Sequence, residues 1–259
     1  MLELNGLYKT FNRGTANEKR AIDGLTLTLE DGDFVTVIGG NGAGKSTTLN
    51  LIAGVFPPDQ GSIVLNDRDI TNLPEHRRAK YLGRVFQDPM MGTAATMGIE
   101  ENLALAYRRG RRRGLRPGVT NREREIYREK LATLGLGLEN RMTSKVGLLS
   151  GGQRQALTLL MATLKKPDLL LLDEHTAALD PKTADKVLKL TEEIVSRDKL
   201  TTLMVTHNMR NAIEYGNRII MMDAGRVVVD IRGEEKKNLT VKDLLEKFNI
   251  ENDRMLLSE

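Results

Sequence analysis

A glycine-rich loop between an apolar run and a helical pattern constrains the fold more than any other feature. Residues 39–46 read Gly-Gly-Asn-Gly-Ala-Gly-Lys-Ser and fit the pattern G-x-x-x-x-G-K-[ST]. The run Phe34–Ile38 before the loop is β-branched and apolar, which is typical of a central parallel strand. The residues from Ser46 to about Ala53 have a helical pattern, which Gly54 ends. We therefore predict a strand, a tight loop and a helix in an α/β fold.

The residue types of this loop predict a phosphate-binding site. Glycines let successive backbone N–H groups curve around an anion, and the helix start adds further N–H groups and the positive end of its dipole. We expect Lys45 to reach the β- and γ-phosphates and Ser46 to bind Mg²⁺ through its hydroxyl. The alternative is a glycine-rich turn without a ligand. The predicted phosphate-binding residues are Gly39, Gly40, Asn41, Gly42, Ala43, Gly44, Lys45, Ser46 and Thr47.

Composition excludes several other kinds of protein. The 259 residues suffice for one large α/β domain or two small ones, and 40% of them are hydrophobic, too many for a disordered chain. There is no cysteine, so disulfides, a cysteine nucleophile and thiolate metal sites are ruled out. The net charge of +4 is too small to indicate nucleic-acid binding. No apolar run approaches the ~20 residues that span a bilayer, and the first residues do not resemble a signal peptide.

Periodicity divides the chain into a strand-rich beginning, a helical middle and an alternating end. Alternation over Leu25–Leu29 predicts a half-buried strand, and Gly61–Leu65 with the segment to Ile70 predicts a short hairpin. Helical patterns dominate from about Pro89 to Leu164. The remaining predicted elements are strands at 81–86, 169–172, 202–205, 219–222 and 227–229, and helices at 152–164 and 181–198.

Two acidic residues follow a buried-strand pattern. Asp173 and Glu174 come directly after Leu169–Leu172. A carboxylate at the C-terminal end of a parallel strand faces the edge where ligands bind in open α/β sheets. We expect Asp173 to bind Mg²⁺ and Glu174 to act as general base on the attacking water. The alternative is a pair of solvated acids at a strand end.

A second small-residue turn opens another helix. Leu149-Ser150-Gly151-Gly152-Gln153 has Ser150 at the predicted N-cap and no lysine. Its N–H groups form a further anion cradle. One nucleotide needs only one such anion cradle from a chain. Two cradles in one chain are expected when two chains hold two nucleotides between them, each chain contributing one cradle to each site.

With these motifs in this order, the sequence resembles the ATP-binding-cassette (ABC) ATPases from about Leu2 to Val229. Residues 39–46 resemble Walker A, 149–153 the ABC signature, and 169–174 Walker B with the catalytic glutamate. The other resemblances are Gln87 to the Q-loop, Ala178-Leu179-Asp180 to the D-loop, His207 to the H-switch and Phe11 to the adenine-stacking aromatic residue.

The resemblance implies a P-loop NTPase core with an antiparallel β subdomain and an inserted α-helical subdomain. The expected boundaries are 1–88 and 165–230 for the core with the β subdomain, 89–164 for the helical subdomain and 231–259 for a helical tail. It also implies ATP and Mg²⁺ as ligands, and a head-to-tail homodimer. Ser150, Gly151, Gly152 and Gln153 would contact the partner's nucleotide, and Asp180 would link the two sites. His207 would contact the γ-phosphate, and Gln87 would reach Mg²⁺ or the water.

Three features leave alternatives open. Tyr8 rivals Phe11, and either side chain could instead pack in the core. His175 stands where the family usually has proline, and we interpret it as a tolerated surface residue rather than one that loosens the turn. Six arginines lie between 108 and 116. They could face anionic lipid, contact a permease or nucleic acid, or form a solvated loop.

The expected function is that of the energy-coupling ATPase of a membrane transporter on the cytoplasmic face of the membrane. Separate-subunit cassettes favour a bacterial importer with permease subunits and an extracytoplasmic solute-binding protein. Residues 87–110 and 233–248 resemble ATPases of tryptophan/tyrosine-type uptake systems. The alternatives are the ATPase of an exporter and a non-transport cassette acting on nucleic acid or ribosomes. The chain has one cassette and no long heptad run, so no nucleic-acid partner is expected.

Overall fold

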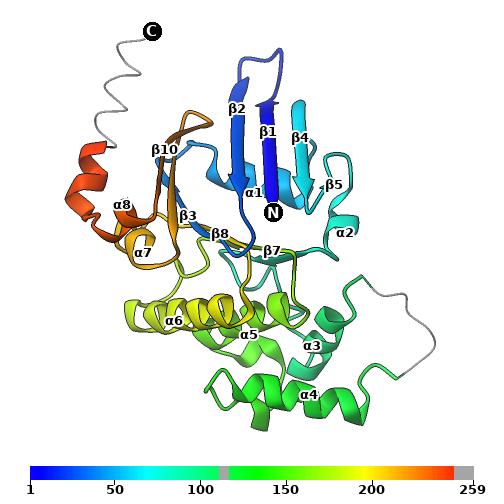
Figure 1. Ribbon diagram of the computed structural model, residues 1–259. Coiled ribbons are helices and arrows are strands. Elements are labelled where there is room, and N and C mark those ends of the chain that lie inside the picture. Colours follow the sequence, from blue (N-terminus) through cyan, green and yellow to red (C-terminus); the bar gives the residue numbers. More distant parts are fainter. Residues whose placement is uncertain (111–116, 248–259) are drawn as a thin grey trace. The chain divides into compact units, whose positions relative to one another are not determined.

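The computed structural model describes residues 1–110 and 117–247, and these form two compact units (Figure 1). One unit contains Met1–Arg78 and the chain from Thr201 onward, and the other contains Ala79–Leu200. The predicted boundaries of core, helical subdomain and tail remain a prediction. Within the described residues, no helix combines the length and the apolar character needed to cross a membrane.

The first unit begins with an antiparallel sheet in the order β2-β1-β4-β5. Leucines alternate along its two long strands, and Leu2, Leu4 and Leu29 are fully buried. This period-two burial confirms the strand predicted from Leu25–Leu29, and the predicted hairpin after Gly61 is present as β4 and β5. The strands are β1 (Leu2–Phe11), β2 (Lys19–Leu29), β4 (Gln60–Leu65) and β5 (Arg68–Asp69).

The same unit contains strands in the order β10-β9-β3-β8, of which β3 carries the glycine-rich loop. β3 pairs in parallel with both β8 and β9, and its residues are buried as far as Ile38. Burial on both faces accounts for the apolar run before the loop. The strands are β3 (Phe34–Gly39), β8 (Thr202–Val205), β9 (Arg218–Asp223) and β10 (Arg226–Arg232).

Four named helices belong to this unit. α1 starts at the glycine-rich loop and ends at Gly54, whose left-handed backbone terminates it. α7 contacts β3, and α8 contacts β10. Residues 241–247 are also helical, in agreement with the helical tail expected after Arg232. The named helices are α1 (Lys45–Ala53), α2 (Glu75–Arg78), α7 (Met209–Glu214) and α8 (Glu234–Lys237).

The second unit combines two parallel strands with helices. β6 and β7 pair in parallel, with Leu82 opposite Leu169. The predicted helices over 152–164 and 181–198 are present as α5 and α6. The elements are β6 (Leu82–Val85), α3 (Ile99–Tyr107), α4 (Asn121–Ala132), η1 (Leu138–Asn140), η2 (Val146–Leu148), α5 (Gly151–Thr163), β7 (Leu169–Asp173) and α6 (Pro181–Asp198).

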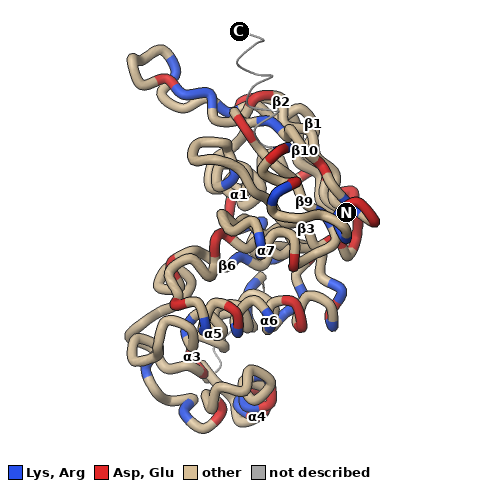
Figure 2. Tube along the Cα trace, turned by 90° about the vertical axis from the view of Figure 1, so that its left-hand side faces the viewer, with Lys and Arg blue, Asp and Glu red and all other residues tan. Residues whose placement is uncertain are grey.

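An apolar cluster from α3, α4 and α5 forms the core of the helical part. Ile99, Leu103, Leu131 and Leu157 are fully buried in it. Acidic and basic residues are interspersed along α4 and α6 (Figure 2), as expected of helices with one solvated face. The helical middle of the chain thus has its own core.

Candidate active site

The predicted site residues form two sets, one in each unit. The first unit contains Phe11, the loop 39–47 and His207, and the second contains Gln87, the segment 150–153, Asp173, Glu174 and Asp180.

The loop of the first set has a backbone that only glycine allows at its start. Gly39 has φ 150°, and a Cβ at this position would lie 2.2 Å from the backbone oxygen of Met222 on β9. Gly225, which follows β9, donates its N–H to the carbonyl of Ala43 at 3.1 Å. The β9–β10 turn therefore supports the loop, a contact that the sequence pattern does not reveal.

Lys45 turns back onto the loop. Its Nζ donates to the carbonyls of Gly39 at 2.9 Å and Gly40 at 3.0 Å, and the residue is only 8% exposed. The two carbonyls fix the ammonium next to the backbone that would surround an anion. The phosphate-binding role of Lys45 stays a prediction.

A second lysine lies close to the loop and was not predicted from the sequence as a site residue. Lys19, at the start of β2, places its Nζ 3.3 Å from the position that a Cβ on Gly42 would occupy. A cation there would attract the same anion as Lys45. Lys19 and Gly42 are 23 positions apart in the sequence, and no local pattern connects them.

His207 is exposed between two anchored neighbours. The N–H of Thr206 donates to the carbonyl of Val37 on β3 at 3.0 Å. Asn208 donates its N–H to the hydroxyl of Thr206 at 3.1 Å, and its side chain caps α7 by accepting from the N–H of Arg210 at 3.0 Å. The backbone on both sides of His207 is therefore fixed, while its side chain is accessible.

Phe11 and its rival Tyr8 have different surroundings. Phe11 is half-buried and meets Phe56 edge to face, with ring centroids 5.2 Å apart, and Lys9 lies 5.8 Å from its centroid. The hydroxyl of Tyr8 instead lies beside Gly24, 3.0 Å from where a Cβ would be. Phe11 offers a partly exposed ring, and its role toward adenine remains a prediction.

In the second set, Asp173 ends β7 and has a cation beside it. The guanidinium of Arg84 on β6 lies 3.7 Å from its carboxylate, and both side chains are mostly buried. Arg84 also stacks on Phe86 at 4.6 Å from the ring centroid. Sequence analysis missed Arg84, although an arginine inside a buried-strand pattern was a detectable signal.

Glu174 has φ 45°, a backbone conformation that residues other than glycine rarely adopt. Its carbonyl accepts the N–H of Ala177 at 2.9 Å, so the chain turns directly after the acid. Strained backbone of this kind is frequent where a side chain must be aimed at a reacting group.

The signature and D-loop segments are brought together in this unit. Ser150 caps α5 by accepting from the N–H of Gln153 at 3.3 Å, which confirms the predicted N-cap. A Cβ on Gly152 would lie 2.1 Å from Cγ2 of Thr183 on α6. Asp180 caps α6 by accepting from the N–H of Thr183 at 3.1 Å. Hydrogen bonding from the side chain of Thr183, and then from its N–H, lowers the pKa of Asp180.

Gln87 is exposed two residues after the end of β6, and its neighbour Phe86 is hydrogen-bonded to the signature helix α5. The carbonyl of Phe86 accepts a hydrogen bond from Nε2 of the fully buried Gln155 at 3.2 Å. Arg154 reaches Sδ of Met90. The residues that follow the signature therefore hold the segment containing Gln87, a connection that sequence analysis missed.

His175 is not a surface residue, so that prediction was wrong. It is 2% exposed, and its Nε2 lies 3.1 Å from the hydroxyl of Thr191 on α6. Because that hydroxyl donates to the carbonyl of Val187 at 2.8 Å, it accepts a hydrogen bond from an Nε2–H of the imidazole. Burial lowers the pKa of His175 to about 4. The chain tolerates histidine here because α6 supplies a partner inside the core.

Two residues of the arginine cluster have partners within the second unit. Arg108 pairs with Glu123 at 3.1 Å. Arg109 donates to the carbonyls of Ala162 at 3.1 Å and Lys165 at 3.2 Å, which caps the end of α5. The other four arginines, Arg111, Arg112, Arg113 and Arg116, lie outside the described residues, and the alternatives for them stay open.

The profile of the ABC transporter family matches residues 22–177, more than half of the chain. The chain belongs to the ABC transporter family. As an ABC ATPase it binds and hydrolyses ATP. It is 45% identical to a tyrosine transport ATP-binding protein of Clostridioides difficile over 96% of this chain and 98% of that protein. It is 35% identical to methionine import ATP-binding protein MetN 2 of Enterococcus faecalis over 88% of this chain and 64% of that protein.

Solved structures confirm the predicted fold class. A dimeric ATP-binding cassette in a post-hydrolysis state, bound to ADP and Pi, has a TM-score of 0.76 and 29% identity over 90% of this chain and 98% of that one. The ADP conformation of another ABC transporter cassette has a TM-score of 0.79 and 26% identity over 96% of this chain and 98% of that one. The individual site residues remain predictions.

Proposed function

We propose that this ABC ATPase supplies the energy for a bacterial importer of aromatic amino acids. The observation that carries the proposal is the 45% identity to a tyrosine transport ATP-binding protein, because the match covers almost the whole of both chains. MetN 2 is a methionine import protein and also supports import, but this chain spans only 64% of its length.

The residues of the two sets support a division of roles. Lys45, held by two loop carbonyls, would bind the β- and γ-phosphates, with Lys19 adding positive charge. Glu174 would accept a proton from the attacking water. His207, exposed between Thr206 and Asn208, would hold the γ-phosphate and help orient that water. Phe11 would stack on the adenine.

The chemistry of the donor set fits Mg²⁺. Ser46, Gln87 and Asp173 offer a hydroxyl, an amide and a carboxylate, and a small hard cation prefers oxygen ligands. When bound, Mg²⁺ would neutralise charge on the phosphate oxygens. Arg84 beside Asp173 would help to orient that carboxylate.

Two copies would form two sites head to tail. Ser150 and Gly152 of one copy would contact the γ-phosphate held by Lys45 of the other, while Gly151 and Gln153 would complete the signature turn. The capped start of α5 favours such a role, because a helix N-terminus stabilises an anion. Asp180 would link the two sites through α6, whose Thr183 contacts the same turn. The dimeric cassette among the similar structures supports this arrangement.

The dimer would act at the cytoplasmic face of the membrane on two permease subunits that supply the transmembrane path. A solute-binding protein outside the membrane would deliver the amino acid. Gln87 would report the nucleotide state to the permease, since the carbonyl of its neighbour Phe86 is held by the signature helix.

Uptake in cells tests the proposal. A strain lacking this gene should take up less labelled tyrosine and tryptophan, and the wild-type chain should restore uptake. Glu174→Gln should not restore it, whereas the matched exposed α6 variant Glu193→Gln should. Labelled methionine and spermidine serve as controls. If the wild-type chain restored uptake of methionine or spermidine and not of tyrosine and tryptophan, the proposed substrate class would be wrong. If it drove export of preloaded amino acid, the proposed direction of transport would be wrong.

A further inference from the structure

A lysine of the C-terminal segment reaches the far end of the helix that follows His207. Lys236 on α8 is 5% exposed. Its Nζ donates to the carbonyls of Ile213 at 2.7 Å, Tyr215 at 2.9 Å and Gly216 at 2.9 Å. These carbonyls belong to the last turn of α7 and the turn after it, where a helix leaves acceptors without intrahelical donors. A cation at this end also complements the helix dipole.

The opposite end of α7 begins beside His207. Asn208, the next residue, is the N-cap of α7 and accepts from the N–H groups of Arg210 and Asn211. α7 is only one and a half turns long, so it transmits a displacement of one end to the other. Whatever fixes the C-terminal end of α7 therefore also fixes the backbone next to His207.

Apolar packing joins the same segments. Leu244, in the helical residues 241–247, is fully buried in a cluster that contains Ala212 of α7 and Ile38 of β3. Leu239 packs against the same cluster. Ile38 directly precedes the first glycine of the phosphate loop. Thr36 of β3 also donates to the carbonyl of Ala212 at 3.0 Å. The position of α7 is therefore fixed by β3 on one side and by the C-terminal segment on the other.

We infer that Lys236 is a positioning residue for His207, acting through α7, and that Lys236 and the buried Leu244 link the C-terminal segment to the catalytic framework of this ATPase. The inference rests on the proposed role of His207 in hydrolysis. Lys236 touches no reacting group in this scheme. It determines where α7 starts and thereby how the His207 side chain is directed.

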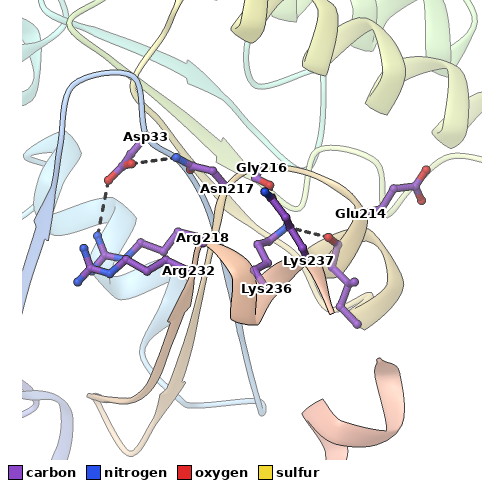
Figure 3. A pocket seen from close by; sticks show the side chains of 10 residues that line it. Asp33, Glu214, Gly216, Asn217, Arg218, Arg232, Lys236 and Lys237 are labelled. Carbon is purple, nitrogen blue, oxygen red and sulfur yellow. Dashed lines mark hydrogen bonds and ion pairs between the residues drawn. The ribbon is translucent and has the colours of Figure 1, made fainter. Parts of the chain in front are cut away.

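The neighbouring lysine provides a matched control. Lys236 and Lys237 line the same pocket of about 560 Å³, with Arg218 and Asp33 on its other walls (Figure 3). Lys237 is 70% exposed and pairs with Glu234 on its own helix at 2.6 Å. Substituting it removes the same charge from the same pocket without removing a bond to α7.

Turnover and NMR of the full chain test the inference. Lys236→Met should lower kcat about tenfold or more with little change in the KM for ATP, because a misdirected group affects the reaction more than nucleotide binding. Lys237→Met should match the wild type. The chain has three histidines, so labelled imidazole Cε1 gives three signals. Lys236→Met should shift the His207 signal and leave those of His76 and His175 in place.

A double variant separates this inference from the proposed function. If Lys236 acts through His207, His207→Ala with Lys236→Met should be no slower than His207→Ala alone. Further loss in the double variant, or an unmoved His207 signal, would overturn the positioning role. Normal turnover of His207→Ala would instead refute the proposed role of His207. If Lys236→Met does not fold by circular dichroism, Leu244→Ala should shift the same signal, and its failure to do so would also overturn the inference.

Discussion

At the scale of single residues, the acid that follows β7 combines a proposed catalytic role with a strained backbone. Glu174 has φ 45° and is half-buried, and the buried His175 follows it. The imidazole is bonded to Thr191 in the middle of α6, so the segment after Glu174 is fixed by a side chain rather than by a proline ring. The two residues lead to separate predictions, one on turnover and one on stability.

Glu174→Gln should retain ATP binding and lose turnover by about 10²–10⁴-fold, because an amide does not accept the proton of the attacking water. Phosphate release measures turnover, and a fluorescent ATP analogue measures binding. Glu193→Gln, which changes an exposed acid on α6, is the control. Turnover near the wild-type rate in Glu174→Gln would show that another group is the base.

His175 should make folding stability depend on pH. Burial lowers its pKa from 6.5 to about 4, so the unfolded chain binds a proton below pH 6.5 that the folded chain excludes. The free energy of unfolding should therefore fall as the pH drops from 7 to 4.5, and His175 should contribute about 2 kcal/mol of that fall. In His175→Gln this contribution should be absent, as urea unfolding at both pH values measures. If the free energy of unfolding depended equally on pH in the wild type and in His175→Gln, the prediction would be wrong. His76→Gln is the control, because it removes an exposed imidazole.

At the scale of elements, the starts of α5 and α6 are in close contact. A Cβ on Gly152 would lie 2.1 Å from Cγ2 of Thr183, so glycine in the signature is needed for packing as well as for the proposed phosphate contact. Asp180 caps α6 by accepting from the N–H of Thr183, and the side chain of Thr183 is next to Gly152, so the D-loop and the signature are mechanically linked within one unit.

Gly152→Ala should therefore lower the free energy of unfolding by about 1–3 kcal/mol, since the methyl group overpacks this contact. Thr183→Ser removes Cγ2 and keeps the hydroxyl, so the double variant should regain much of the lost stability. Urea unfolding of the four proteins gives the coupling energy. Simple additivity of the two changes would show that the contact does not cause the loss.

At the scale of the whole molecule, the chain contains one phosphate loop and one signature turn, and the proposed dimer would join each loop to the partner's turn. Ser150→Asp keeps an N-cap but places a negative charge where a γ-phosphate would lie. Lys45→Ala removes the charge that binds that phosphate. Each variant alone should be inactive in both sites of its homodimer.

Mixing the two variants should restore roughly a quarter of the wild-type turnover, because half of the dimers are mixed and each of these has one intact site. The measurement compares the ATP turnover of the mixture with that of each variant alone. Ser150→Asn, a neutral N-cap, distinguishes the added charge from the loss of the hydroxyl. If mixing restores nothing, each site is built within one chain or the dimer does not exchange.

Local patterns in the amino-acid sequence were sufficient to predict the strand, loop and helix around Lys45, the two acids at the end of β7, the N-cap at Ser150, and the family. Each of these depends on residues close together in the chain, where periodicity and turn chemistry leave a readable pattern. Three contacts are visible only in the folded chain: His175 is buried against Thr191, Arg84 pairs with Asp173, and Lys236 holds the end of α7. These contacts join segments far apart in sequence, and their energy comes from burial and geometry that no local pattern encodes.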